Sequence, residues 1–156
     1  MKKIILFILA LSFNYGFCQD SNNDYMITSL VQLKQTAPEF SFTTSDGKKA
    51  KLSDFKGKYI FVDFWASWCT ACRAQSPQLK SLHEKFKKNN FEVIGVSIDN
   101  NRDAWLKAVE KDKLTWPNVL SAGGRTSEVS QLYGINGLPD NLLINPDGII
   151  VKRNMK

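Results

Sequence analysis

YIFVDFWASWCTAC, residues 59–72, contains an apolar run that leads directly into two cysteines. Its first half is aromatic or β-branched apart from Asp63, and such an apolar run predicts a buried central strand. After the cysteines, residues 73–88 repeat apolar side chains at the spacing of a helix, at Leu79, Leu82 and Phe86. Cys69 and Cys72 therefore lie where a strand ends and a helix begins.

The two thiols stand three positions apart, a spacing at which they can close and open a disulfide. The unpaired N–H groups and the dipole of a helix N-terminus favour an anion, which lowers the pKa of a thiol below its free value of about 8.5. We therefore expect Cys69 to be the nucleophile. Cys72, one turn into the helix and more covered, is expected to resolve the mixed disulfide. The alternative is half of a zinc site, which needs about four ligands, and only His83 offers a further nitrogen.

These residues resemble the thioredoxin superfamily, and in particular the extracytoplasmic TlpA/ResA-like thiol–disulfide oxidoreductases. The resemblance spans residues 37–152. Residues 62–72 match the redox motif, and Pro77 matches the family's helix-kinking proline. Residues 133–139, YGINGLP, resemble the glycine-rich approach to a cis-proline loop, and a strand and the turn NPDG at 145–148 follow.

The resemblance implies an α/β, thioredoxin-like fold with a mixed central sheet flanked by helices and an N-terminal β-hairpin. The pattern of strands alternating with helices, closed by a hairpin, predicts the same class without the family. We expect strands at 39–43, 50–52, 59–65, 91–98, 116–120 and 141–144, helices at 73–88, 103–111 and 127–132, and a last hairpin turn at 146–148.

Three departures from the family limit what carries over. Gln75, which cannot ionise, stands where the family often has a Glu that tunes thiol acidity. Residues 70–71, Thr-Ala, lack the proline common in reductases, which leaves the redox direction open. The family's C-terminal helix has no residues here to form it. Either the protein is natively short, so that a partner covers an apolar sheet face, or the sequence is incomplete.

Four further residues have roles that the resemblance implies. Asp63 matches the buried acid beneath the dithiol; burial should raise its pKa, so that it takes the proton of Cys72. The alternative for Asp63 is a hydrogen-bonded core acid. Leu138 and Pro139, with a cis bond, would leave a backbone edge free to pair with an extended partner, unless Pro139 is an ordinary turn proline. Trp68 is expected to be an exposed apolar contact for a protein partner.

The N-terminus predicts export. Two lysines precede the apolar residues 4–13, a run too short for the ~20 residues that span a bilayer. We expect residues 1–18 to be a cleaved signal peptide, residues 19–36 a linker or entry segment, and residues 37–156 the thioredoxin-like domain. The alternative is a lipoprotein anchored through Cys18. Either form would work in the periplasm or elsewhere outside the cytoplasm, where a dithiol needs an electron donor to stay reduced.

Composition excludes several other classes of function. The formal charge of +6 is scattered without interleaved aromatic residues, so no nucleic acid is expected. No metal or organic cofactor is expected either, and we predict a monomer. His83, the sole histidine, is expected on a solvated helix face.

Peroxidase chemistry is not expected, because Val62 and Ala66 stand where peroxiredoxins need Pro and Thr or Ser. A copper-delivery role needs a longer spacer than the one between the two cysteines. We predict a protein-disulfide oxidoreductase that acts on exported proteins, as a reductase rather than an oxidant. The family resemblance implies apocytochromes or other exported dithiol proteins as substrates. A disulfide-introducing oxidant and a binding module whose thiols are incidental are the alternatives.

Overall fold

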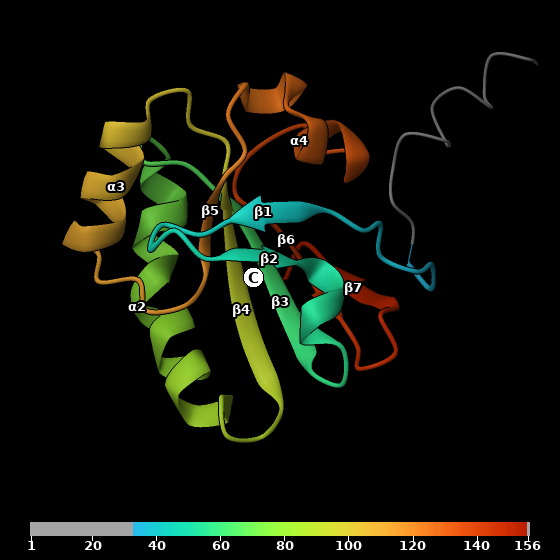
Figure 1. Cartoon of the computed structure of the whole chain (residues 1–156). Coiled ribbons are helices and arrows are strands. Elements are labelled where there is room, and N and C mark those ends of the chain that lie inside the picture. Colours follow the sequence, from blue (N-terminus) through green and yellow to red (C-terminus); the bar gives the residue numbers. More distant parts are fainter. Residues whose placement is uncertain (1–32, 156) are drawn as a thin grey trace, which may run out of the picture.

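A five-stranded mixed sheet organises the computed structural model, with strand order β5-β4-β3-β6-β7 (Figure 1). The structure describes residues 33–155, so the predicted signal peptide at 1–18, Cys18 and most of the 19–36 segment lie outside the described residues. The strands are β1 (Ser41–Thr43), β2 (Lys49–Lys51), β3 (Tyr59–Trp65), β4 (Phe91–Ser97), β5 (Asn118–Leu120), β6 (Asp140–Ile144) and β7 (Ile150–Arg153). The helices are α2 (Thr70–Phe86), α3 (Arg102–Lys111) and α4 (Glu128–Leu132), with short 3₁₀ turns η1 (Leu52–Phe55) and η2 (Gly124–Thr126).

Strand β3 is the centre of the sheet. It pairs in parallel with β4 and antiparallel with β6, so both of its edges are hydrogen-bonded. Val62 and Phe64 are fully buried, as expected for an apolar central strand. The predicted bounds, 59–65, are confirmed to the residue.

Two apolar layers cover the two faces of the sheet. Helices α2 and α3 lie together beside the sheet in Figure 1 and pack on the face that presents Phe61 and Trp65. The other face carries Val62 and Phe64 under the β1-β2 hairpin and α4. Tyr133 follows α4, and its hydroxyl donates a hydrogen bond to the carbonyl of Pro38 at 2.5 Å. This bond ties the α4 segment to the chain before β1.

The predicted fold class and hairpin are confirmed, and the bounds of the predicted elements other than β3 differ from the expected ones by a few residues. The sheet is mixed because β3, β4 and β5 pair in parallel, whereas β6 pairs antiparallel with both of its neighbours, β3 and β7. In the described residues no helix follows β7. No helix of residues 33–155 is long and apolar enough to cross a membrane.

Only one of the three apolar residues whose spacing predicted helix α2 is buried. Leu79 is buried, but Leu82 and Phe86 are each 39% exposed. The buried stripe of the helix is instead formed by Cys72, Ser76, Leu79 and His83. Its spacing is helical, but two of its members are polar, so the apolar pattern alone pointed to a neighbouring stripe.

His83 is buried, which corrects the expectation of a solvated histidine. Its Nε2 lies 2.8 Å from Oε1 of Glu92, at the start of β4. Its ring packs edge-on to Trp116, with ring centroids 6.0 Å apart. The imidazole is therefore covered because it has both a carboxylate partner and an aromatic neighbour in the core.

Candidate redox site

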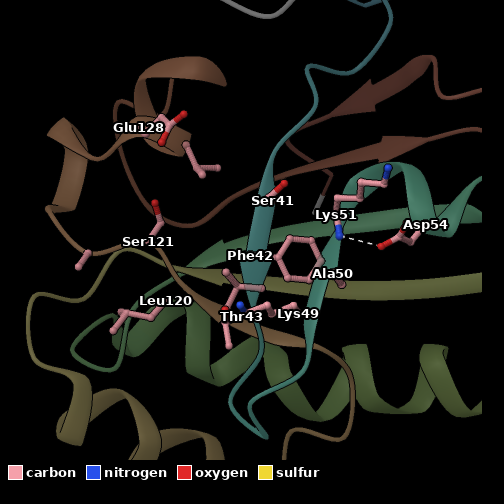
Figure 2. A pocket seen from close by; sticks show the side chains of 13 residues that line it. Ser41, Phe42, Thr43, Lys49, Ala50, Lys51, Asp54, Leu120, Ser121 and Glu128 are labelled. Atoms are coloured by element: carbon pink, nitrogen blue, oxygen red, sulfur yellow. Dashed lines mark hydrogen bonds between the residues drawn. The ribbon is translucent and has the colours of Figure 1, made fainter.

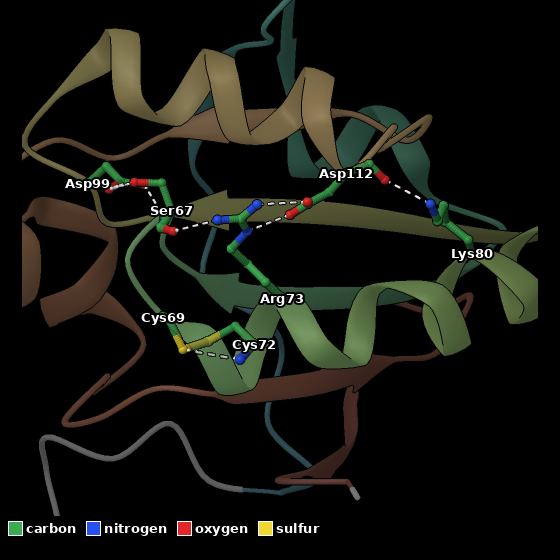
Figure 3. Close-up of polar contacts among 7 residues, drawn as sticks. All are labelled: Ser67, Cys69, Cys72, Arg73, Lys80, Asp99 and Asp112. Carbon is green, nitrogen blue, oxygen red and sulfur yellow. Dashed lines mark hydrogen bonds and ion pairs between the residues drawn. A yellow bond between two sulfur atoms is a disulfide. The ribbon is translucent and has the colours of Figure 1, made fainter.

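Cys69 and Cys72 form a disulfide at the start of α2, with Cα atoms 5.3 Å apart (Figure 3). Cys69 is the N-cap residue, and its Sγ accepts a hydrogen bond from the Cys72 N–H at 3.2 Å. A short turn leads from β3 into the helix, because the Cys69 N–H donates to the carbonyl of Ala66 at 3.0 Å. The expected place of the pair, between a strand and a helix, is confirmed.

The two cysteine residues are almost equally buried in the disulfide form. Cys69 is 7% exposed and Cys72 is 5% exposed, so the expectation that Cys72 is more covered holds by a narrow margin. What separates them is position. Cys69 lies at the point where the free N–H groups of the helix converge, and Cys72 lies in the first turn.

The predicted substrate-binding residues lie on two segments. Trp68 directly precedes Cys69, and its side chain is 65% exposed. Leu138 is half-buried and packs against the apolar cluster that includes both cysteines. The Leu138–Pro139 peptide is cis, and Pro139 is exposed at the entry to β6. The structure therefore places the loop before β6 against the apolar cluster that contains the disulfide.

Asp63 lines a groove of about 300 Å³ between β3, α2 and β6. The residue is half-buried, and desolvation raises the pKa of its carboxyl to about 7. Gln75 and Ser76, in the turn of α2 that follows Cys72, line the same groove. The acid and the first turns of the redox helix thus face one cavity.

Sequence reasoning missed a second acid near the pair, Asp99. It follows β4, is 1% exposed, and accepts hydrogen bonds from Ser67 in the turn before Cys69. The sequence feature that could have revealed Asp99 is an acid directly after the predicted strand 91–98, next to the strand that leads to the cysteines. The sequence also did not predict that Arg73 forms a two-point ion pair with Asp112 at the end of α3.

A larger hollow, of about 750 Å³, opens between the hairpin and the segment around α4 (Figure 2). Lys49, Lys51, Asp54 and Glu128 contribute its charged groups, and no cysteine or histidine lines it. The thiol chemistry therefore lies elsewhere. Among residues 33–155, no group of three or more His, Cys, Asp or Glu side chains is arranged to hold a metal ion.

Comparison with known proteins agrees with the geometry of the site. Residues 33–153 match the model of the AhpC/TSA family. The chain is 34% identical over 122 residues to the thiol-disulfide oxidoreductase ResA of Bacillus thuringiensis, which covers 78% of this chain and 69% of the relative. It is 31% identical over 156 residues to the ResA protein of Bacillus anthracis, which covers 97% of this chain and 84% of the relative.

Solved structures give the same result. The thioredoxin domain of a thiol-disulfide oxidoreductase from Bacteroides vulgatus superposes with a TM-score of 0.75 and 35% identity, covering 81% of this chain and 90% of that one. A thiol-disulfide oxidoreductase from Bacteroides fragilis superposes with a TM-score of 0.73 and 38% identity, covering 78% and 91%. The chain belongs to the AhpC/TSA family and is a ResA-like thiol-disulfide oxidoreductase with Cys69 and Cys72 as its CxxC pair.

Proposed function

We propose that this protein reduces disulfides in exported proteins, with Cys69 as the nucleophile and Cys72 as the resolving thiol. One observation carries the proposal: Cys69 caps the N-terminus of a helix, where its sulfur accepts a hydrogen bond from the Cys72 N–H, next to the exposed side chain of Trp68. The first feature favours a thiolate, and the second offers an apolar contact to a protein partner.

In the first step, the Cys69 thiolate attacks one sulfur of a substrate disulfide. A new S–S bond joins Cys69 to the substrate, the substrate S–S bond breaks, and the other substrate sulfur leaves as a thiolate that takes up a proton. The helix N-terminus assists this step because it holds the attacking sulfur as an anion before the substrate arrives.

In the second step, Cys72 loses its proton and attacks the Sγ of Cys69. The intramolecular disulfide forms, the mixed disulfide breaks, and the substrate leaves as a dithiol that has gained two electrons. Asp63 is the base for this proton, since a carboxyl with a pKa of about 7 is close to neutral pH and can both accept and return it. The groove beside α2 is the route by which the proton reaches solvent.

Trp68, Leu138 and Pro139 are the proposed contacts for the substrate chain. Trp68 and Pro139 are exposed, and Leu138 packs against the cluster that contains the disulfide, so an extended segment bound here would lie over the sulfurs. Backbone pairing of this kind depends little on substrate side chains, so several exported proteins, apocytochromes among them, would fit.

The predicted signal peptide at residues 1–18 supports work outside the cytoplasm, in the periplasm or an equivalent compartment, with a lipid anchor on Cys18 as the other form of export. Residues 19–36 would then be a linker ahead of the 37–156 domain. Such a compartment does not keep thiols reduced, so the oxidised protein needs a dithiol donor, which we place in the membrane, to regenerate it after each turnover.

Two measurements test the proposal. The reduction potential of the pair, followed by tryptophan fluorescence in dithiothreitol buffers, is expected near that of thioredoxin, about −270 mV. A value near about −120 mV would make the protein an oxidant. The absence of any reversible couple would leave a binding module.

Trapping of partners tests the roles of the two thiols. Cys72→Ala should accumulate a covalent complex with an exported protein on a non-reducing gel, because the resolving attack is lost. Cys69→Ala, the matched control, should trap nothing and should abolish turnover. Complexes that form with Cys69→Ala instead would reverse the assignment.

A further inference from the structure

We propose that Asp99 is a positioning residue for the redox reaction. Through Ser67, it fixes the turn that carries Cys69, and so holds the sulfur of Cys69 at the N-terminus of α2 in both redox states. This inference rests on the proposed role of Cys69 as the nucleophile. It assigns a task to a buried acid that takes no part in the exchange steps.

The Asp99 carboxylate holds Ser67 at two points (Figure 3). Its Oδ2 accepts a hydrogen bond from the Ser67 N–H at 2.7 Å, and its Oδ1 accepts one from the Ser67 hydroxyl at 2.7 Å. The Ser97 hydroxyl, in β4, also donates to Oδ2 at 2.7 Å. A carboxylate that is 1% exposed needs such donors, because an unpaired buried charge is costly.

A second contact holds Ser67 from the helix side. The Ser67 carbonyl accepts a hydrogen bond from Nη1 of Arg73 at 3.3 Å. Arg73 is itself fixed, because its Nε and Nη2 donate to the two carboxylate oxygens of Asp112 at 2.6 and 2.8 Å. Lys80 donates to the carbonyl of Asp112 at 2.7 Å, which ties the end of α3 to α2.

The N–H, the hydroxyl and the carbonyl of Ser67 are therefore all held, two residues before Cys69. Cys69 is itself tied to this turn, because its N–H donates a hydrogen bond to the carbonyl of Ala66, the residue before Ser67. A turn held from β4 on one side and from α2 on the other has little freedom to move when the disulfide opens. Small displacements of a reacting atom reduce rates steeply, so a fixed turn favours the exchange.

A buried carboxylate near a thiol could act in another way, by charge. Repulsion would disfavour the Cys69 thiolate, and loss of the charge would then speed its reactions. Two substitutions separate the two effects. Asp99→Asn removes the charge but keeps an oxygen and an N–H that can bond to Ser67, whose hydroxyl donates or accepts. Asp99→Ala removes both the charge and the contacts.

The test measures the rate at which iodoacetamide alkylates the reduced full-length protein across a range of pH, with the modified cysteine identified by mass spectrometry. We expect Asp99→Ala to raise the pKa of Cys69 and to slow alkylation at neutral pH about tenfold, because the sulfur leaves the helix N-terminus. The alkylation rate of Asp99→Asn should remain within about twofold of the wild-type rate, because the amide keeps the hydrogen bonds to Ser67. Asp147→Ala, on an exposed turn, is the matched control.

Ser67 provides a milder pair, should Asp99→Ala fail to fold. Ser67→Ala loses the hydroxyl contact and should slow alkylation, whereas Ser67→Thr keeps the hydroxyl and should restore the rate. Faster alkylation in both Asp99 variants would mean that the acid acts by charge and would overturn the inference. An unchanged rate in Asp99→Ala and Ser67→Ala would also overturn it. Alkylation of Cys72 before Cys69 in the wild type would instead overturn the proposed function.

Discussion

Asp63 shows at the scale of one residue how function and stability oppose each other. Its carboxyl lies on the central strand with no cationic side chain contributing to its pKa, and desolvation alone raises that pKa to about 7. An acid of this kind weakens a fold when it ionises. The proposed role in proton transfer would account for an acid at this position on β3.

The raised pKa predicts how stability depends on pH. The unfolded chain ionises Asp63 near pH 3.8, whereas the folded protein keeps it protonated to about pH 7. The folded state therefore binds the extra proton in this window, and the free energy of unfolding falls as pH rises from about 4 to about 7. Asp63→Asn removes the titration and should be more stable than the wild type at pH 8 by roughly 1 to 3 kcal/mol, a value reduced for partial solvent access.

Urea unfolding of the oxidised protein at pH 5 and at pH 8 measures this difference. The advantage of Asp63→Asn should shrink at the lower pH, and Asp147→Asn, on an exposed turn, controls for the substitution itself. Equal stability of Asp63→Asn and the wild type at both pH values would show that the carboxyl ionises freely. A variant that is more stable and yet slower in disulfide exchange would support the proposed proton transfer.

The sequence predicted the residues of the redox pair because their signal is local. A thiol spacing and an apolar strand are both contained in residues 59–72, and the structure confirms their placement. Asp99 escaped prediction because its partner Ser67 lies 32 positions away. A contact between separate strand ends depends on which strands become neighbours, and no local pattern contains that information.

At the scale of elements, helix α2 shows where a periodic pattern fails. The spacing of the apolar residues Leu79, Leu82 and Phe86 predicted the helix, but its buried stripe includes Ser76 and His83. Buried polar residues interrupt an apolar pattern. They can be buried only when another element supplies a hydrogen-bond partner, as Glu92 of β4 does for His83. The element itself was predicted, and the face that it buries was not.

Strand β4 yields a prediction because it is packed tightly at Gly95. A Cβ at this position would lie 2.8 Å from Oδ1 of Asn118, 3.0 Å from Nε1 of Trp116 and 3.3 Å from Nε1 of Trp65. Asn118 cannot move freely, since its Nδ2 donates to the Trp116 carbonyl at 2.8 Å. Gly95→Ala should therefore destabilise the protein by about 1 to 3 kcal/mol in urea unfolding, the usual effect of overpacking.

Gly137→Ala is the matched control for Gly95→Ala. Nothing lies within 4 Å of its added Cβ, and its φ is not in the left-handed region. This variant should unfold within about 1 kcal/mol of the wild type, and the loss of unfolded-chain entropy would even favour it. Equal effects at the two glycines would show that the contacts around Gly95 relax at little cost.

At the scale of the whole molecule, the redox state and the stability of the fold are linked by a thermodynamic cycle. The Cys69–Cys72 disulfide lies in the apolar cluster that joins α2, α3 and the sheet. Its reduction therefore changes the packing on that face of the sheet. If the Cys69–Cys72 pair has a lower reduction potential in the folded protein than in the unfolded chain, folding favours the disulfide. The oxidised protein must then be the more stable form.

Because of this cycle, the stabilities of the two redox forms test the proposed reductase without a substrate. For the proposed reductase, the oxidised form should unfold at a higher urea concentration than the form reduced with dithiothreitol, with each 30 mV between folded and unfolded couples worth about 1.4 kcal/mol. A strong oxidant behaves in the opposite way, because its reduced form is the stabilised one. Cys69→Ala cannot form the disulfide, so it should unfold at the same urea concentration with and without dithiothreitol. Greater stability of the reduced wild type would therefore contradict a reductase, because the fold would then favour the state that a reductase must readily leave.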